Sequence, residues 1–246
     1  MLGNEGAHVF LIGRTREPME VSKADIEQAG GHATVTTFDI QNITQLQDFI
    51  ADVQTQTGRL DILVNNAGVQ FPDSIIDANP EDWRTMLETN ILAVLAGSQA
   101  AVHAMRASGS EGHIVNISST AAQSNERGVY GATKHAVNVI SATLRTELEN
   151  DTIRVTTVMP GAVATNFARN YDPAFLKSLI GSGELPFEPQ RGQQLPPPVL
   201  EQIQTRLKQV LCSPKDIAHA VLYAVTQPIH VNVAEIVVRP PKTLNI

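Results

Sequence analysis

The sequence has very little cysteine and no surplus of positive charge. Cys212 is the only cysteine among 246 residues, so no internal disulfide can form. This composition fits a reducing compartment, and we expect a cytoplasmic protein. The chain has 18 Lys and Arg against 25 Asp and Glu, a net charge of −7. Because a nucleic-acid-binding surface needs an excess of positive charge, we expect no nucleic-acid partner.

Several recognisable signals are missing as well. No apolar run approaches the roughly 20 residues that span a bilayer, and the first residues lack both the basic start and the apolar stretch of a signal peptide. The seven histidines are scattered without a His-Glu-x-x-His motif, and no cysteine pair is present. The Gly-x-Ser-x-Gly elbow of serine hydrolases is absent. We therefore expect no membrane partner and no bound metal, and the sequence does not favour a serine hydrolase.

The dominant pattern is an alternation of short runs rich in Val, Ile and Leu with longer segments of helical period. This pattern is typical of βα units, and strands that are apolar on both faces belong to a sheet covered by helices on both sides. The sequence predicts an α/β fold with a doubly wound, mostly parallel sheet. We expect strands near 8–12, 34–38, 60–64, 113–118, 153–158 and 234–238, and helices near 17–29, 43–57, 80–107, 128–149, 198–210 and 214–226.

The segment 166–213 interrupts this alternation. It is rich in proline and glycine, which break regular structure. A long irregular insertion inside a compact domain commonly forms a lid or a binding loop. We expect such a lid within a single domain that spans residues 1–246.

Tyr130 and Lys134 are the first candidates for chemistry. They lie four residues apart at the start of the predicted helix 128–149, so both side chains emerge on one helical face. An ammonium group near a phenol favours the phenolate and lowers the pKa of the phenol from about 10 toward the range of a working general acid or base. Because a Tyr-x-x-x-Lys pattern also arises by chance, the surrounding sequence has to decide its meaning.

Three predicted strands end in polar or small residues. Strand 113–118 leads into Ser119, strand 60–64 leads into Asn-Asn-Ala-Gly at 65–68, and strand 153–158 leads into Pro-Gly-Ala-Val-Ala-Thr at 160–165. Ligands of open α/β sheets bind beyond the carboxyl ends of the strands. These segments therefore predict one shared crevice, although serine and Asn-Gly sequences are also common in plain turns.

Together these motifs resemble those of the classical short-chain dehydrogenases and reductases. The shared elements follow the order of that family over nearly the whole chain: Asn-Asn-Ala-Gly at 65–68, Asn90, Ser-Ser at 118–119, Tyr130 with Lys134, and Pro-Gly-x-Val-x-Thr at 160–165. The resemblance implies a Rossmann-like fold and an NAD(P)-dependent oxidoreductase.

The resemblance also implies a role for each catalytic residue. Tyr130 would donate or accept the proton, and Lys134 would lower the pKa of Tyr130 and hold the cofactor ribose. Ser119 would orient the substrate oxygen, with Ser118 as the alternative because the spacing to Tyr130 is two residues shorter than is common in the family. Asn90 would support a water that links Lys134 to solvent.

The end of strand 8–12 bears on the choice of cofactor. Arg14 stands where NAD-binding chains place a carboxylate for the ribose 2′-hydroxyl, and an arginine there suits the 2′-phosphate of NADP(H). We therefore expect NADP(H) in preference to NAD(H), with a solvated surface arginine as the alternative. The resemblance assigns further cofactor contacts to Asp39, Ile40, Asn66, Ala67, Gly68, Tyr130, Lys134, Pro160, Gly161, Val163 and Thr165.

One element of the family pattern is missing from the start of the sequence. The family opens with a strand and a glycine-rich loop that receives the cofactor pyrophosphate, whereas residues 2–7 look like the end of a first helix. The missing strand is central in the family's order, so we expect a break between strands 8–12 and 60–64. Either further residues precede Met1 in the natural protein, or a shortened relative persists as a non-enzymatic interaction protein with impaired cofactor binding.

The substrate and the assembly are indicated only by the resemblance. It implies a small-molecule ketone or secondary alcohol, and the stretches 213–218 and 227–233 look like the branch that acts on small hydroxy acids and related carbonyls. Family members commonly assemble through the helices near 80–107 and 128–149. We expect a homodimer or a homotetramer.

Overall fold

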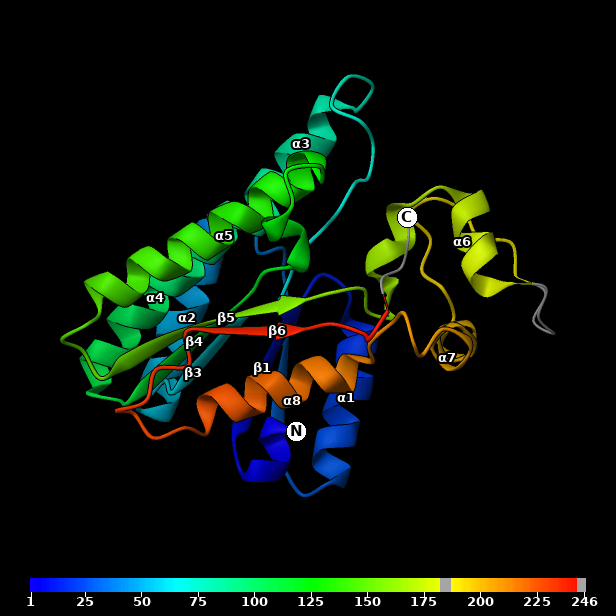
Figure 1. Ribbon diagram of the computed structural model, residues 1–246. Helices are drawn as coiled ribbons and strands as arrows, with labels where there is room; N and C mark the ends of the chain where they lie inside the picture. The colour runs from blue at the N-terminus through cyan, green and yellow to red at the C-terminus, as the bar shows by residue number, and fades with distance from the viewer. Residues whose placement is uncertain (182–186, 243–246) are drawn as a thin grey trace.

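The computed structural model, which describes residues 1–181 and 187–242, contains two parallel sheets (Figure 1). One sheet has two strands and the other has four, and no strand of the described residues joins them. The predicted break between strands 8–12 and 60–64 is therefore present. The first sheet pairs β1 (His8–Gly13) with β2 (His32–Thr37), and the second has the order β3 (Ile62–Asn65), β4 (Gly112–Ile117), β5 (Ile153–Pro160) and β6 (Glu235–Val238).

All the expected strands are present, with ends shifted by one or two residues, and most of the expected helices match equally well. Residues 2–7, expected as the end of a helix, begin with a 3-10 helix, η1 (Leu2–Glu5). The α-helices are α1 (Arg16–Gln28), α2 (Ile43–Thr57), α3 (Pro80–Leu87), α4 (Ala93–Ser108), α5 (Gly128–Glu147), α6 (Pro173–Ile180), α7 (Pro197–Arg206) and α8 (Pro214–Val225).

Helices cover both faces of the four-stranded sheet (Figure 1). On one face, Ile114 of β4 and Val155 of β5 pack against Met105 of α4. On the other face, Val115 and its neighbours pack against Val221 of α8. Successive residues of a strand point to opposite faces, so the apolar run of β4 supplies both layers. This is the doubly wound arrangement predicted from the sequence.

Three segments differ from the sequence prediction. The helix expected over 198–210 ends four residues early, as α7 at Arg206. The helix expected over 80–107 is divided by a π-helical turn, η2 (Glu88–Leu92), between α3 and α4. The lid segment contains α6, which was not expected because the surrounding prolines and glycines argue against a helix. Pro173 lies in the first turn of α6, where its missing N–H costs nothing, and Asp172 caps that turn by accepting from the backbone N–H of Ala174 at 2.8 Å.

Candidate active site

The carboxyl ends of β3, β4 and β5 open into a cavity of about 990 Å³. Asn66 follows β3, Ser119 follows β4, and the segment 160–165 ends β5 and continues from it; all of them line this cavity. Tyr130 and Lys134 reach the same cavity from the first turns of α5. The structure therefore brings the three predicted strand ends together with the Tyr-x-x-x-Lys pair.

Tyr130 is almost fully enclosed, and its side chain is 7% exposed. The pKa of Tyr130 is raised to about 12, chiefly by burial; the hydrogen bond with the Ser119 hydroxyl lowers this pKa, and the Tyr171 phenol raises it. Nζ of Lys134 lies 6.0 Å from the centre of the Tyr130 ring. The pKa of Tyr130 is therefore raised in this structure, not lowered as expected, because burial of the phenol is the largest cause of the shift.

Lys134 is a buried cation with a single described hydrogen bond. Its Nζ donates to the backbone carbonyl of Ile117 at 2.9 Å, and its exposed fraction is 3%. Burial lowers the pKa of Lys134 to about 8, so the side chain is still mostly protonated at pH 7. A β-carbon built on Gly68 would lie 3.4 Å from this Nζ, at the near limit of van der Waals contact.

The two neighbouring serines have different surroundings. The Ser118 hydroxyl is buried and donates to the backbone carbonyl of Lys134 at 3.0 Å. The Ser119 hydroxyl is half-buried, accepts from the backbone N–H of Ala121 at 3.1 Å and lies close enough to Tyr130 to affect its pKa. Ser118 is thus engaged with α5, and Ser119 is the serine placed beside the phenol.

Asn90 lies in the π-helical turn η2 and is 0% exposed. Its Oδ1 accepts from the backbone N–H of Val69, and its Nδ2 donates to the carbonyl of the same residue, both at 2.9 Å. Nδ2 also donates to the Thr133 hydroxyl at 3.1 Å. Asn90 therefore fixes the chain just after Gly68 and ties it to α5.

A second cavity, of about 260 Å³, adjoins the first. Arg14, Asp39, Ile40 and Ala67 line it, and Gly68 lines both cavities. Nη1 of Arg14 lies 3.7 Å from a carboxylate oxygen of Asp39, and both side chains are substantially exposed. The cofactor-binding residues predicted from the resemblance therefore divide into two groups that meet at Gly68.

The segment 160–165 lines the larger cavity along its whole length. Gly161 donates its N–H to the Val238 carbonyl at 2.8 Å, and Val163 forms an isolated parallel bridge with Cys212. The Thr165 hydroxyl accepts from the N–H of Phe167 at 3.2 Å and so starts the 3-10 helix η4 (Asn166–Asn170). The proposed cofactor residues of this segment are thus anchored to β6 and to the lid.

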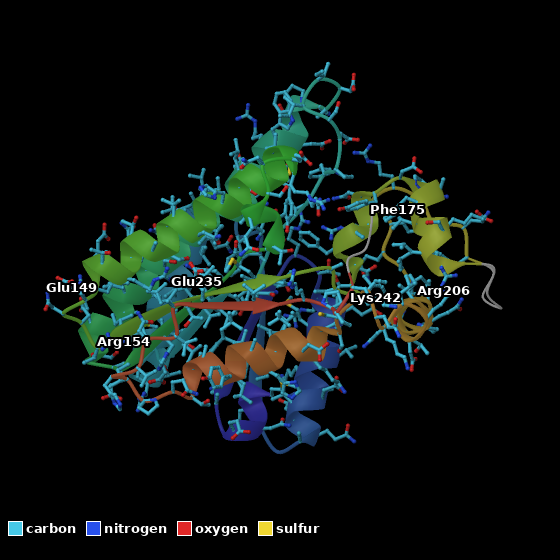
Figure 2. The ribbon with its side chains drawn as sticks, viewed as in Figure 1. Glu149, Arg154, Phe175, Arg206, Glu235 and Lys242 are labelled. Carbon is cyan, nitrogen blue, oxygen red and sulfur yellow. The ribbon has the colours of Figure 1, made fainter. Side chains whose placement is uncertain are left out.

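Sequence reasoning missed Tyr171 and Arg169, which the lid contributes to the two cavities. The Phe167 ring lies 5.7 Å from the Tyr130 ring, Tyr171 raises the pKa of Tyr130, and Arg169 lines the smaller cavity. Figure 2 shows Phe175 of α6 on the lid side of the molecule, far from Glu149, which follows the end of α5. The irregular composition of 166–213 indicated a lid but did not single out Tyr171 or Arg169.

Residues 1–181 and 187–242 contain no strand-to-helix turn rich in glycine beside these cavities. The same residues contain no cluster of three or more His, Cys, Asp and Glu side chains suited to a metal ion. None of the helices described is long and apolar enough to cross a membrane.

Comparison with known proteins decides the family. A family model described as short chain dehydrogenase matches residues 1–174. The chain belongs to the short-chain dehydrogenase family. Among curated relatives of this short-chain dehydrogenase, an uncharacterized oxidoreductase of Staphylococcus aureus (strain USA300) is 33% identical over 242 residues, which is 98% of this chain and 89% of the relative. One from Staphylococcus haemolyticus (strain JCSC1435) is 32% identical over 241 residues, 97% of this chain and 89% of the relative.

Solved structures agree with this assignment. The short-chain dehydrogenase is similar to a metagenomic short-chain oxidoreductase in complex with NADP, at 26% identity and a TM-score of 0.72 over 97% of this chain and 88% of the other. It is also similar to the closed form of serine dehydrogenase complexed with NADP+, at 28% identity and a TM-score of 0.73. This match covers 96% of this chain and 86% of the other. The chain shares its fold with an alcohol dehydrogenase from Thermococcus sibiricus, at 21% identity and a TM-score of 0.76. This match covers 100% of this chain and 91% of the other.

Proposed function

We propose that this short-chain dehydrogenase is an NADP(H)-dependent enzyme that interconverts a small ketone and a secondary alcohol, including small hydroxy acids and related carbonyls. The observation that carries the proposal is the convergence of Tyr130, Ser119 and Lys134 at one cavity on the carboxyl edge of the four-stranded sheet. A phenol, a hydroxyl and a buried cation together suit proton exchange with a carbonyl oxygen.

The residues that line the two cavities fit a dinucleotide, which supplies or accepts the hydride when bound. Arg14, Asp39 and Ile40 would hold the adenosine end, with Arg14 facing a 2′-phosphate. Asn66, Ala67, Gly68, Tyr130, Lys134, Pro160, Gly161, Val163 and Thr165 would hold the centre and the nicotinamide end. The bare α-carbon at Gly68 supports this assignment, because it keeps the junction of the cavities open. Solved relatives carry NADP in complex, which agrees with the preference for NADP(H).

The chain's own residues would carry the proton. With its pKa raised to about 12, Tyr130 holds its proton at neutral pH and can donate it to the oxygen of a ketone. Ser119 would donate a hydrogen bond to the same oxygen and so orient it. The Lys134 ammonium would favour the phenolate that is left, and Asn90 would hold the segment 65–68 in place through its hydrogen bonds to Val69.

The test is NADPH consumption by the purified protein with a panel of small ketones and 2- and 3-oxo acids. Tyr130→Phe should lower kcat by about 100-fold or more, because the general acid is removed while the ring remains. Tyr223→Phe, which removes an exposed phenol on α8, is the matched control and should keep full turnover. Full turnover by Tyr130→Phe would overturn the mechanism.

The second candidate is an interaction protein that binds cofactor weakly. The absence of a glycine-rich strand-to-helix turn from the described residues favours it, because such a turn cradles the pyrophosphate in this fold. If the purified chain neither binds NADPH nor oxidises it with any substrate, the enzymatic proposal fails for this chain. Translating the DNA upstream of Met1 for an in-frame strand and glycine-rich turn separates the two cases further. A cytoplasmic location and a homodimer or homotetramer stay predictions.

A further inference from the structure

The smaller cavity is lined by an arginine that the proposed function does not use. Arg169 belongs to η4 in the lid, and it meets Arg14 of the β1 end and Asp39 of the β2 end at this cavity. Its side chain is half-buried, and its Nη1 donates to the backbone carbonyl of Asn166 at 3.1 Å. Within the described ranges 1–181 and 187–242, Arg169 forms no ion pair.

The two guanidinium groups lie close enough to repel each other. Burial lowers the pKa of Arg169, and the positive charge of Arg14 lowers this pKa further. Asp39 is the one carboxylate among the described residues that line this cavity, and it already approaches Arg14 at 3.7 Å. Two guanidiniums with one carboxylate leave the cavity with a net positive charge, which an anion would neutralise.

The position of Arg169 is fixed by hydrogen bonds on both sides. Asn166 forms two hydrogen bonds with the backbone of Leu195, accepting from its N–H at 2.6 Å and donating to its carbonyl at 3.3 Å. The buried Asn170 donates from Nδ2 to the carbonyl of Gln70 at 2.9 Å. The short helix that carries Arg169 is thus tied to the lid at its start and, at its end, to the segment that follows Gly68.

We propose that Arg169 and Arg14 together form a clamp for the 2′-phosphate of the nucleotide, so that the lid supplies the second positive charge that distinguishes NADPH from NADH. The proposal rests on the proposed function for the identity of the ligand. Guanidinium groups bind phosphate oxygens through paired N–H donors, and two of them from different elements can enclose one doubly charged phosphate. Arg169 is therefore a specificity-determining residue, and it couples recognition of the adenosine end to the position of the lid.

The test uses two probes that differ only in the 2′-phosphate: adenosine 2′,5′-bisphosphate and adenosine 5′-monophosphate. Their affinities are measured by calorimetry for the full chain and for Arg169→Gln. The bisphosphate should bind at least about tenfold more weakly to Arg169→Gln, because a charge-assisted contact is lost, while the affinity for the monophosphate should stay within about twofold. Arg169→Lys keeps the positive charge but lacks the paired N–H donors of the guanidinium group. Its affinity for the bisphosphate should lie between those of the intact chain and Arg169→Gln.

A lid arginine outside the cavity provides the matched control. Arg191 pairs with Asp73 and Asp82 and lines neither cavity, so Arg191→Gln removes one lid charge without touching the clamp. It should leave both affinities unchanged. Thermal unfolding of each variant shows whether the fold is retained.

Three outcomes would contradict the clamp. If Arg169→Gln lost affinity equally for both probes, Arg169 would contact the 5′-phosphate or only support the lid. If Arg191→Gln lost as much affinity for the bisphosphate as Arg169→Gln, net charge alone would explain the effect. Failure of the intact protein to bind the bisphosphate would also overturn the proposal. If the bisphosphate binds in an Arg169-dependent way but no ketone is reduced, the clamp stands and the proposed reaction fails.

Discussion

The four-stranded sheet and the two-stranded sheet have similarly apolar strands, but they are buried to different degrees. In β4 and β5, the side chains of Ile114, Val115, Val155 and Val158 are 0% exposed. In β1 no residue is buried, in β2 only Ala33 is, and α1 contributes no buried residue. A strand therefore needs neighbours along both edges as well as helices on its faces before its apolar side chains leave water.

The difference is concentrated where the two sheets face each other. The larger cavity extends between them, since Val9 of β1 and Val64 of β3 both line it. All four residues of β3 are only half-buried, although β3 pairs fully with β4. The proposed proton donor, Tyr130, lies on the well-packed half, whereas the adenosine end of the proposed site depends on the less buried half.

The largest expected difference is in local opening. Backbone amides of β1 and β2 should exchange hydrogen with solvent through local opening, because few apolar contacts hold the two-stranded sheet. The free energy of opening at these amides should be lower than that at the β4 amides by about 3 kcal/mol or more. Hydrogen exchange followed by mass spectrometry measures both regions in one experiment. Equal protection of β1 and β4 would show that the two sheets open as one unit.

The same substitution in each sheet should have unequal effects on stability. Val115→Ala removes two fully buried methyl groups from β4 and should lower the free energy of unfolding by about 2 kcal/mol. Val9→Ala in the half-buried β1 should cost less than about 1 kcal/mol. Urea unfolding measures both. The comparison fails if Val9→Ala proves as costly as Val115→Ala.

The smallest effect concerns the buried cation. Below the pKa of about 8 that burial gives Lys134 in the folded chain, the lysine is charged in both states, and the folded state bears the full cost of desolvation. Between this pKa and the ordinary value of 10.5, the folded chain has lost the proton and the unfolded chain retains it, so stability rises with pH. From pH 8 to 9 the contribution of Lys134 is about 1 kcal/mol.

Urea unfolding at several pH values measures how the free energy of unfolding changes with pH. The intact chain should show the increase above pH 8, and Lys134→Met should lack it. Lys23→Met removes one lysine charge from α1, on the less buried half, and controls for net charge. Parallel stability curves for the intact chain and Lys134→Met between pH 7 and 10 would contradict the prediction.

The sequence predicted those elements whose signals are local. Helix α2 has the bounds expected from its pattern, because Asn42 caps its start and Gly58, at a φ of 78°, ends it. The π-helical turn at 88–92 was not predictable, because the apolar pattern of 80–107 runs through it without a break. The break in the sheet was predicted because a whole motif of the family pattern is absent from the sequence.

For the site, the sequence predicted which residues meet but not their electrostatics. Tyr130, Lys134 and Ser119 could be placed because each lies at a strand end or on one helical face. The direction of the Tyr130 pKa shift depends on how completely the phenol is enclosed, and residues of the lid contribute to that enclosure. Arg169 was not found because nothing in its local sequence distinguishes it from a surface arginine.

The two hydrogen bonds between Asn90 and Val69 make the side chain of Asn90 a substitute for a peptide group. Its amide offers one donor and one acceptor to a single backbone residue, as a neighbouring strand would, so the extended chain beyond β3 is held although the ladder to β4 has ended. A carboxylate of the same shape accepts but cannot donate. The position therefore selects asparagine over aspartate for a backbone-pairing reason that is independent of any role in proton transfer.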